Sequence, residues 1–225
     1  MAQPALEVRN LNAWHNKALV LRDINLVVDP GQLVCLLGSY EPGRSTVLRS
    51  ISGLTGERTG SVRINGTESI HLPPGKVKPL GLSYCPEEQH LHNDLSCEEN
   101  LLFPVDGAAA LGGGMSLADI YDIFPVLKSF QHHPAGHLNT AERQLLAIAR
   151  ALRLGANVLL LDAITSIVTS SLASTLSRAL GLLKEQHYTI VMATNTPPFT
   201  APLADQYYVV QNGTLHNPEL PVNAL

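Results

Sequence analysis

This chain of 225 residues has few cysteines, no excess of positive charge and no long apolar run. The three cysteines, Cys35, Cys85 and Cys97, are an odd, scattered set without metal-ligand spacing. The formal net charge of −4 at pH 7 implies no general affinity for nucleic acid. No uncharged apolar run reaches the roughly 18 residues that a membrane span needs, and residues 1–10 lack the basic and apolar regions of a signal peptide.

What is present indicates an ordinary globular protein. A hydrophobic content of 45% and this length fit one well-packed domain. Cys35 lies in an apolar run and is most simply a buried, reduced thiol. We therefore expect a cytoplasmic protein.

Strand and helix patterns alternate along the chain. Short apolar or alternating runs predict strands at residues 5–11, 19–28, 34–37, 61–65, 80–85, 158–162, 188–193 and 206–211. Longer periodic segments predict helices at residues 117–128, 140–154 and 172–186. Because several strands are continuously apolar, we predict an α/β fold with a mainly parallel sheet that is covered on both faces.

One stretch has the spacing of a phosphate-binding P-loop. An apolar run ends at Gly38, a turn follows, and a helix begins just before Val47. Gly38, Gly43 and Ser45 match the motif G-x-x-x-x-G-K-[ST]. Arg44 stands where the motif has lysine. The spacing therefore predicts nucleotide-binding ancestry.

Two residues of this loop work against phosphate binding, and a third, Arg44, differs from the usual lysine. In a working loop, backbone N–H groups at a helix N-terminus surround the phosphates, and Pro42 has no N–H to donate. Glu41 adds a carboxylate where a polyanion would lie, and like charges at close range repel. Arg44 can bind phosphate, but guanidinium has a different reach and shape from the lysine ammonium.

Several motifs in a fixed order resemble the ATP-binding subunit of ABC transporters over essentially the whole chain. The resemblance is closest to the branched-chain amino-acid (and urea or amide) uptake group. The matching stretches are residues 84–87 (Tyr-Cys-Pro-Glu), 95–101 (Leu-Ser-Cys-Glu-Glu-Asn-Leu), 123–127 (Ile-Phe-Pro-Val-Leu) and 142–152 (Glu-Arg-Gln-Leu-Leu-Ala-Ile-Ala-Arg-Ala-Leu).

The resemblance implies a P-loop NTPase fold of the ABC ATPase type, with a parallel core sheet, an antiparallel β part and a small helical lobe. We expect one domain over 1–225, with a core lobe at 1–87 and 138–225 and a helical lobe at 88–137. Residues 34–37 and 158–161 are expected to form neighbouring parallel strands.

The resemblance also implies partners: a membrane permease subunit and a second ATP-binding subunit. This would place the protein in the cytoplasm, peripheral to the inner membrane. The expected permease-docking surface surrounds Glu87, Leu91, Leu101 and Phe103.

ATP and Mg²⁺ are the cofactors that the resemblance implies. The expected nucleotide contacts are Trp14, His15, Gly38, Gly43, Arg44, Ser45, Thr46, Glu87 and Asn139, and the expected metal contacts are Ser45 and Asp162.

The family's catalytic positions are altered in this chain. Ala163 replaces the glutamate that polarises the attacking water, and such a loss typically costs about 10²–10⁴-fold in rate. Thr194 occupies the position of the switch histidine, and Ile167 that of a glycine in the D-loop. The signature Ser-Gly-Gly reads Asn-Thr-Ala at residues 139–141, and the added Cβ atoms oppose close approach to a phosphate.

Two functions stay open from these residues. One is an importer subunit with impaired nucleotide binding and hydrolysis. The other is a pseudo-ATPase that serves as a scaffold or interaction module. The apolar strands are intact and the substitutions fall at ligand-contacting positions, so the fold is expected to be kept in both cases.

Overall fold

The structure is a computed structural model that describes residues 3–38, 43–86, 91–103, 113–162, 164, 171–194 and 202–217. Five positions discussed above lie outside the described residues: Glu41, Pro42, Glu87, Ala163 and Ile167.

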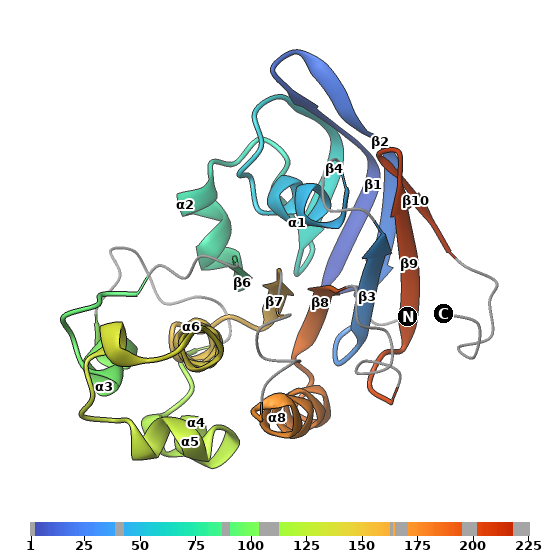
Figure 1. The fold of residues 1–225 in the computed structure, drawn as a ribbon. Coiled ribbons are helices and arrows are strands. Elements are labelled where there is room, and N and C mark those ends of the chain that lie inside the picture. Colours follow the sequence, from blue (N-terminus) through green and yellow to red (C-terminus); the bar gives the residue numbers. More distant parts are fainter. Residues whose placement is uncertain are drawn as a thin grey trace.

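The described elements are strands and short to medium helices, with a run of helices between β6 and β7 (Figure 1). They are β1 (Leu6–His15), β2 (Ala18–Val28), β3 (Leu33–Gly38), α1 (Ser45–Ile51), β4 (Arg58–Ile64), β5 (Thr67–Glu68), α2 (Pro74–Val77), η2 (Lys78–Leu80), β6 (Leu82–Cys85), α3 (Cys97–Leu102), α4 (Leu117–Ile123), α5 (Pro125–Ser129), η3 (Ala135–His137), α6 (Thr140–Arg153), β7 (Val158–Leu161), α8 (Ala173–Glu185), β8 (Thr189–Ala193), β9 (Gln206–Gln211) and β10 (Thr214–His216).

The strands form two sheets. The smaller sheet is antiparallel, with the order β2-β1-β4-β5, and the larger has the order β10-β9-β3-β8-β7-β6. In the larger sheet every neighbouring pair is parallel except the β9–β10 hairpin. The α/β prediction with a mainly parallel core sheet and an antiparallel part is therefore confirmed.

One expected pair of neighbours is wrong. β3 and β7 belong to the same sheet, but β8 lies between them and pairs with both. All five residues of β8 are buried, so this strand needs a partner on each side and a covering layer on each face. Its apolar sequence indicates a central strand but does not reveal which strands flank it.

The pleat of the large sheet divides its side chains between two hydrophobic clusters. In β3, Leu33 and Cys35 face a cluster shared with α3, α4, α6 and α8. Val34 and Leu36 face the opposite cluster, shared with the small sheet and α1. Both faces of β3 are therefore dry, as its continuous apolar sequence predicts.

The helix expected over 117–128 is two helices instead. α4 ends at Ile123 and α5 begins at Pro125, with Phe124 between them at φ −121° and ψ 71°. Proline disfavours helical geometry at the residue before it and has no N–H for an intrahelical bond. In the described part of the chain, no helix is long and apolar enough to cross a membrane.

The end of α3 corrects one residue of the expected docking surface. Leu101 is only 1% exposed and belongs to the core, whereas Leu102 and Phe103 are exposed. The ring of His92 lies against Phe103 with centroids 4.2 Å apart. The buried Asn100 side chain accepts from His92 N–H at 2.9 Å and donates to the His92 carbonyl at 2.9 Å, which fixes the segment before α3.

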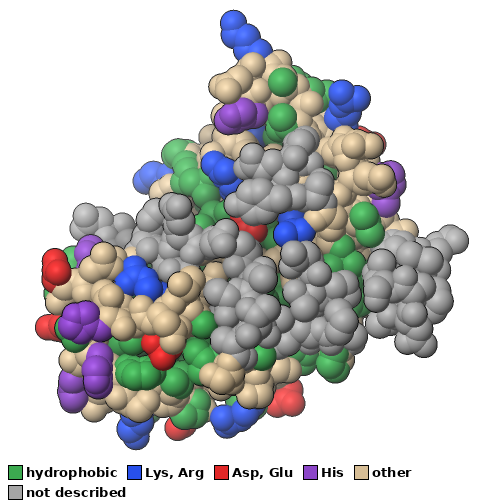
Figure 2. Space-filling model, viewed as in Figure 1, with side chains coloured by type: hydrophobic (Ala, Val, Ile, Leu, Met, Phe, Trp, Pro, Cys, Tyr) green, Lys and Arg blue, Asp and Glu red, His purple; other side chains and the backbone are tan. Residues whose placement is uncertain are grey.

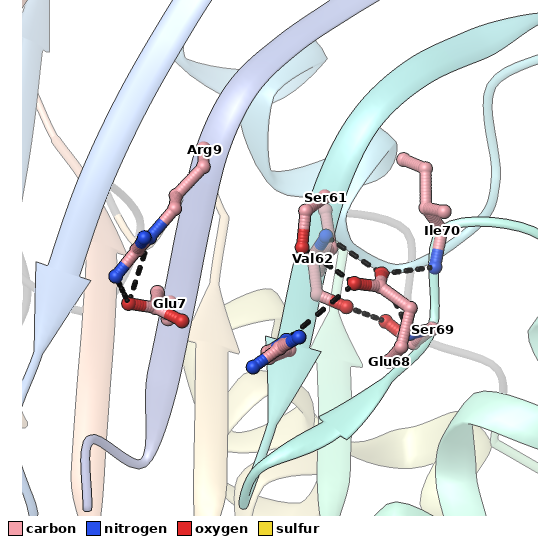
Figure 3. A network of polar contacts seen from close by, with 8 residues as sticks. Glu7, Arg9, Ser61, Val62, Glu68, Ser69 and Ile70 are labelled. Atoms are coloured by element: carbon pink, nitrogen blue, oxygen red, sulfur yellow. Dashed lines mark hydrogen bonds and ion pairs between the residues drawn. The ribbon is translucent and has the colours of Figure 1, made fainter.

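A polar network closes the small sheet at the β4–β5 hairpin (Figure 3). Glu68 accepts hydrogen bonds from the Ser61 hydroxyl and from the backbone N–H groups of Val62, Ser69 and Ile70. Partial burial acts to raise the pKa of Glu68, but these four hydrogen bonds together lower it. Glu68 is therefore held as a carboxylate that ties the hairpin to the following loop.

Candidate nucleotide and metal site

The described part of the P-loop lies between β3 and α1. Gly38 ends β3 at φ +113°, and a Cβ at this position would lie 2.1 Å from the carbonyl oxygen of Val210 in β9. Only glycine fits this conformation and this close approach. Gly43 and Arg44 are buried directly before Ser45, where α1 begins, and Thr46 is half-buried in its first turn.

Arg44 folds back on the loop. Its side chain is only 8% exposed, and its Nη1 donates a hydrogen bond to the Gly38 carbonyl. The Nε atom is buried and has no hydrogen-bond partner among the described residues. A buried, unpaired donor on a cation is costly, and in this conformation the guanidinium is directed to the loop's own carbonyl.

Asp162 is the centre of a buried polar cluster. Its Oδ1 accepts a hydrogen bond from Ser45 Oγ at 2.8 Å, and its Oδ2 accepts one from the Tyr84 hydroxyl at 2.7 Å. Ser45 is 2% exposed and Asp162 is 4% exposed. The backbone N–H of Asp162 donates to the Cys85 carbonyl at 2.9 Å, which extends the β6–β7 pairing by one residue. The side chains of Ser45 and Asp162, the two expected metal contacts, therefore lie next to each other.

Thr194 lies at the same edge of the sheet. Gly38, Asp162 and Thr194 each stand at or just after the carboxyl end of a parallel strand. The Thr194 backbone N–H donates to the Leu36 carbonyl at 3.1 Å, and the residue is buried. In parallel α/β sheets this edge is where ligands bind.

The remaining expected contacts lie elsewhere in the fold. Asn139 is the N-cap of α6: its Oδ1 accepts from Glu142 N–H at 3.0 Å, and Glu142 Oε2 accepts from its N–H at 2.9 Å. Trp14 is half-buried and His15 is exposed at the tip of the β1–β2 hairpin. Among the described residues, no hydrogen bond joins these three to Ser45 or Asp162.

Tyr84 is the site residue that sequence reasoning missed. It is paired in register with Leu160, which lies two residues before Asp162 and so faces the same side of the sheet. A tyrosine among apolar strand residues needs a partner for its hydroxyl, and the nearest acid on that face is the one at the strand end. The pairing of Tyr84 with Leu160 could have indicated this contact, but only with the knowledge that β6 and β7 are neighbouring strands.

The residues of this site suit Mg²⁺. The Ser45 hydroxyl and the Asp162 carboxylate are hard oxygen donors next to the Arg44 cation, and such donors fit Mg²⁺ with a phosphate group. Bound Mg²⁺ would neutralise phosphate charge. Histidine side chains gather over the α3–α5 region (Figure 2), but among the described residues no group of three or more His, Cys, Asp or Glu could hold a metal ion.

A glycine-ended strand, a hydroxyl at the helix start and a strand-end aspartate define the P-loop class. Residues 21–166 match the family model described as "ABC transporter". The chain is 31% identical over 212 residues to a probable branched-chain amino acid transport ATP-binding protein, LivF, from Archaeoglobus fulgidus, a match that covers 92% of this chain and 89% of that protein.

Two further likenesses extend over nearly the whole chain. A high-affinity branched-chain amino acid transport ATP-binding protein, BraG, from Pseudomonas aeruginosa is 28% identical over 218 residues, covering 93% of this chain and 90% of that protein. A solved structure of an ATP-binding subunit of an ABC transporter is 25% identical with a TM-score of 0.78, covering 94% of this chain and 88% of that chain. The chain belongs to the ABC transporter family, in the class of its ATP-binding proteins.

Proposed function

We propose that this protein is the ATP-binding subunit of a branched-chain amino-acid importer, with weak nucleotide binding and very slow hydrolysis. The names of the two relatives support the transported class. The geometry of Arg44 is the single observation that carries the proposed weakness, because its guanidinium bonds the loop's own carbonyl where a lysine would hold phosphate.

The proposed nucleotide contacts follow the P-loop. Gly38, Gly43, Arg44, Ser45 and Thr46 would face the phosphates, and Ser45 with Asp162 would hold Mg²⁺. Trp14 and His15 would lie against the adenine, while Glu87 and, from a partner subunit, Asn139 would complete the site. Ala163 and Thr194 occupy the catalytic positions without a group that can serve as the family's base or switch.

We propose that residues 88–137 form the helical lobe and that its exposed apolar end meets a permease subunit. Leu102 is 50% exposed and Phe103 is 38% exposed, and the Asn100 side chain holds the neighbouring segment in place. A second ATP-binding subunit would complete the assembly at the cytoplasmic side of the inner membrane.

The test compares the unaltered protein with a restored variant. The variant combines Arg44→Lys, Glu41→Gly, Pro42→Ala and Ala163→Glu with serine and two glycines at 139–141. We expect hydrolysis near the detection limit for the unaltered protein and a clear rise for the variant, measured as phosphate release with Mg-ATP. Arg49→Lys, at an exposed position within α1, is the matched control for Arg44→Lys at the N-cap of α1 and should leave hydrolysis unchanged.

Turnover by the unaltered protein at about 1 s⁻¹ or faster would contradict the proposed impairment. Binding of a fluorescent ATP analogue, with and without Mg²⁺, separates the two functions left open by the sequence. Weak, Mg²⁺-dependent binding supports the importer subunit. Absence of any binding, together with a retained fold and permease association, supports the scaffold.

A further inference from the structure

A groove separate from the P-loop lies between α4 and α8, which are in contact in the fold (Figure 1). It encloses about 560 Å³ and is lined by both helices, by the segment before α4 and by the segment that leads into β8. A volume of a few hundred Å³ is typical of small-molecule sites. We call it the α4–α8 groove.

The two walls of the α4–α8 groove carry opposite charges. Asp119, Asp122 and Ile123 have the i, i+3, i+4 spacing of one helix face and form the α4 wall. Arg178 and Leu182 are four residues apart on α8 and form the other wall. An acidic wall therefore faces a basic one across the opening.

These opposite charges do not pair with each other. Among the described residues, neither Asp122 nor Arg178 makes a hydrogen bond or an ion pair within 4.0 Å. Asp119 is held in position, because its Oδ2 accepts from the Ser116 hydroxyl at 2.6 Å in the capping box of α4. The walls thus present charges of both signs with space between them, and of these Asp119 is held in place by its capping box.

The floor of the groove is apolar. Met115 and Ile123 are buried core residues, and the half-buried ring of Tyr188 closes the end. Burial, and then the Asp119 carboxylate, raise the pKa of the Tyr188 hydroxyl. Gly114 lies in the segment before α4 and lets this segment pack closely against the backbone of Arg153, since a Cβ at Gly114 would be 2.4 Å from the Arg153 carbonyl oxygen.

We propose that the α4–α8 groove binds a small zwitterion of the amino-acid class. Its ammonium would lie against Asp122 and Asp119, its carboxylate against Arg178, and its apolar side chain on the Met115 and Ile123 floor. Such a ligand satisfies both unpaired charges at once, which a simple cation, a simple anion or an uncharged molecule cannot do. Because the bound zwitterion would contact α4 and α8 together, it would restrain these two helices relative to each other and so act as an effector of the protein.

The zwitterion class rests on the groove alone, whereas the choice of L-leucine as the probe rests on the proposed importer function. Calorimetric titration of the full chain with L-leucine should give saturable binding at millimolar concentrations. Leucinol lacks the carboxylate and 4-methylpentanoate lacks the ammonium, so each should bind about tenfold more weakly or not at all.

Two substitutions test the walls, each with a matched control. Arg178→Gln and Asp122→Asn should each weaken leucine binding about tenfold or more. Arg22→Gln in β2 and Asp94→Asn before α3 change exposed residues outside the groove and should leave it unchanged. All four positions are exposed, and circular dichroism melts would check that each variant folds.

Absence of saturable leucine binding overturns the proposal, as does equal binding of either analogue or an unaltered affinity in both wall variants. Binding of the fluorescent ATP analogue is measured on the same samples. If the protein fails to bind leucine but binds the ATP analogue, the result contradicts the groove proposal and leaves the proposed nucleotide site untouched. If the unaltered protein fails to bind the ATP analogue, the result contradicts the proposed nucleotide site and leaves the groove proposal untouched.

Discussion

At the scale of single residues, Asp162 accepts two hydrogen bonds from different elements, a buried one from Ser45 and a partly buried one from Tyr84. Tyr84→Phe removes one of them and should lower the free energy of unfolding by about 1–3 kcal/mol, because the acceptor is charged and buried. Urea denaturation measures this change. Tyr208→Phe is the control: its hydroxyl donates at 2.9 Å to the neutral Gln206 side chain, so the loss should be less than about 1 kcal/mol. Equal losses in the two variants would contradict a special role for the Asp162 carboxylate.

The buried Cys85 thiol should make the free energy of unfolding vary with pH in the alkaline range. Burial raises the pKa of its thiol from 9.0 to about 12. The folded state therefore keeps a proton that the unfolded state loses, and stability falls as pH rises from about 9 towards about 12, with a slope of up to roughly 1.4 kcal/mol per pH unit. Chemical denaturation at several pH values should show a shallower alkaline slope for Cys85→Ala than for the unaltered protein. Equal slopes would show that the thiol stays protonated in both states or ionises in both.

The P-loop spacing of Gly38 and Ser45, together with the family resemblance at Asp162, was sufficient to expect that these residues lie near one another, because such motifs fix which strand and helix ends meet. It was not sufficient for Tyr84, whose role depends on the pairing of β6 with β7. The conformation of Arg44 was also beyond the sequence, since the bond to the Gly38 carbonyl is a choice among rotamers.

At the scale of elements, α6 begins with a capping box in which Asn139 replaces the family's serine. Asn139→Ala should destabilise the protein by about 0.5–2 kcal/mol, because Glu142 N–H loses its acceptor. Asn139→Asp keeps an acceptor oxygen and should retain most of the stability. Thermal melts would measure both. If the aspartate variant loses as much as the alanine variant, the cap oxygen is not the cause.

Element positions were predicted well where one periodic pattern ran without interruption. The expected helices 140–154 and 172–186 agree with α6 and α8 to within one residue at each end. The expected helix 117–128 failed because Pro125 stops α4 while the apolar spacing continues through it. The β3–β8–β7 order could not be predicted, since buried parallel strands all have similar apolar sequences.

At the scale of the whole molecule, α4 and α8 pack into the same core cluster on one face of the large sheet, so they are joined through this core as well as across the groove. The fold could be predicted from the family motifs, whereas the α4–α8 groove could not. Its walls come from helices far apart in the sequence, and no periodic pattern relates Asp122 to Arg178.

The position of β3 has a consequence for folding during synthesis. Its two neighbours, β8 and β9, are made only after most of the chain has left the ribosome, whereas β1, β2, β4 and β5 can pair early. Nascent chains of which residues 1–86 have emerged from the ribosome should therefore protect the small sheet from protease but leave residues 33–38 open to cleavage. Protection of 33–38 should appear only once residues 189–193 have emerged, and earlier protection would contradict this order. Until then, an apolar strand that is dry on both faces in the finished protein stays available to chaperones and to other nascent chains.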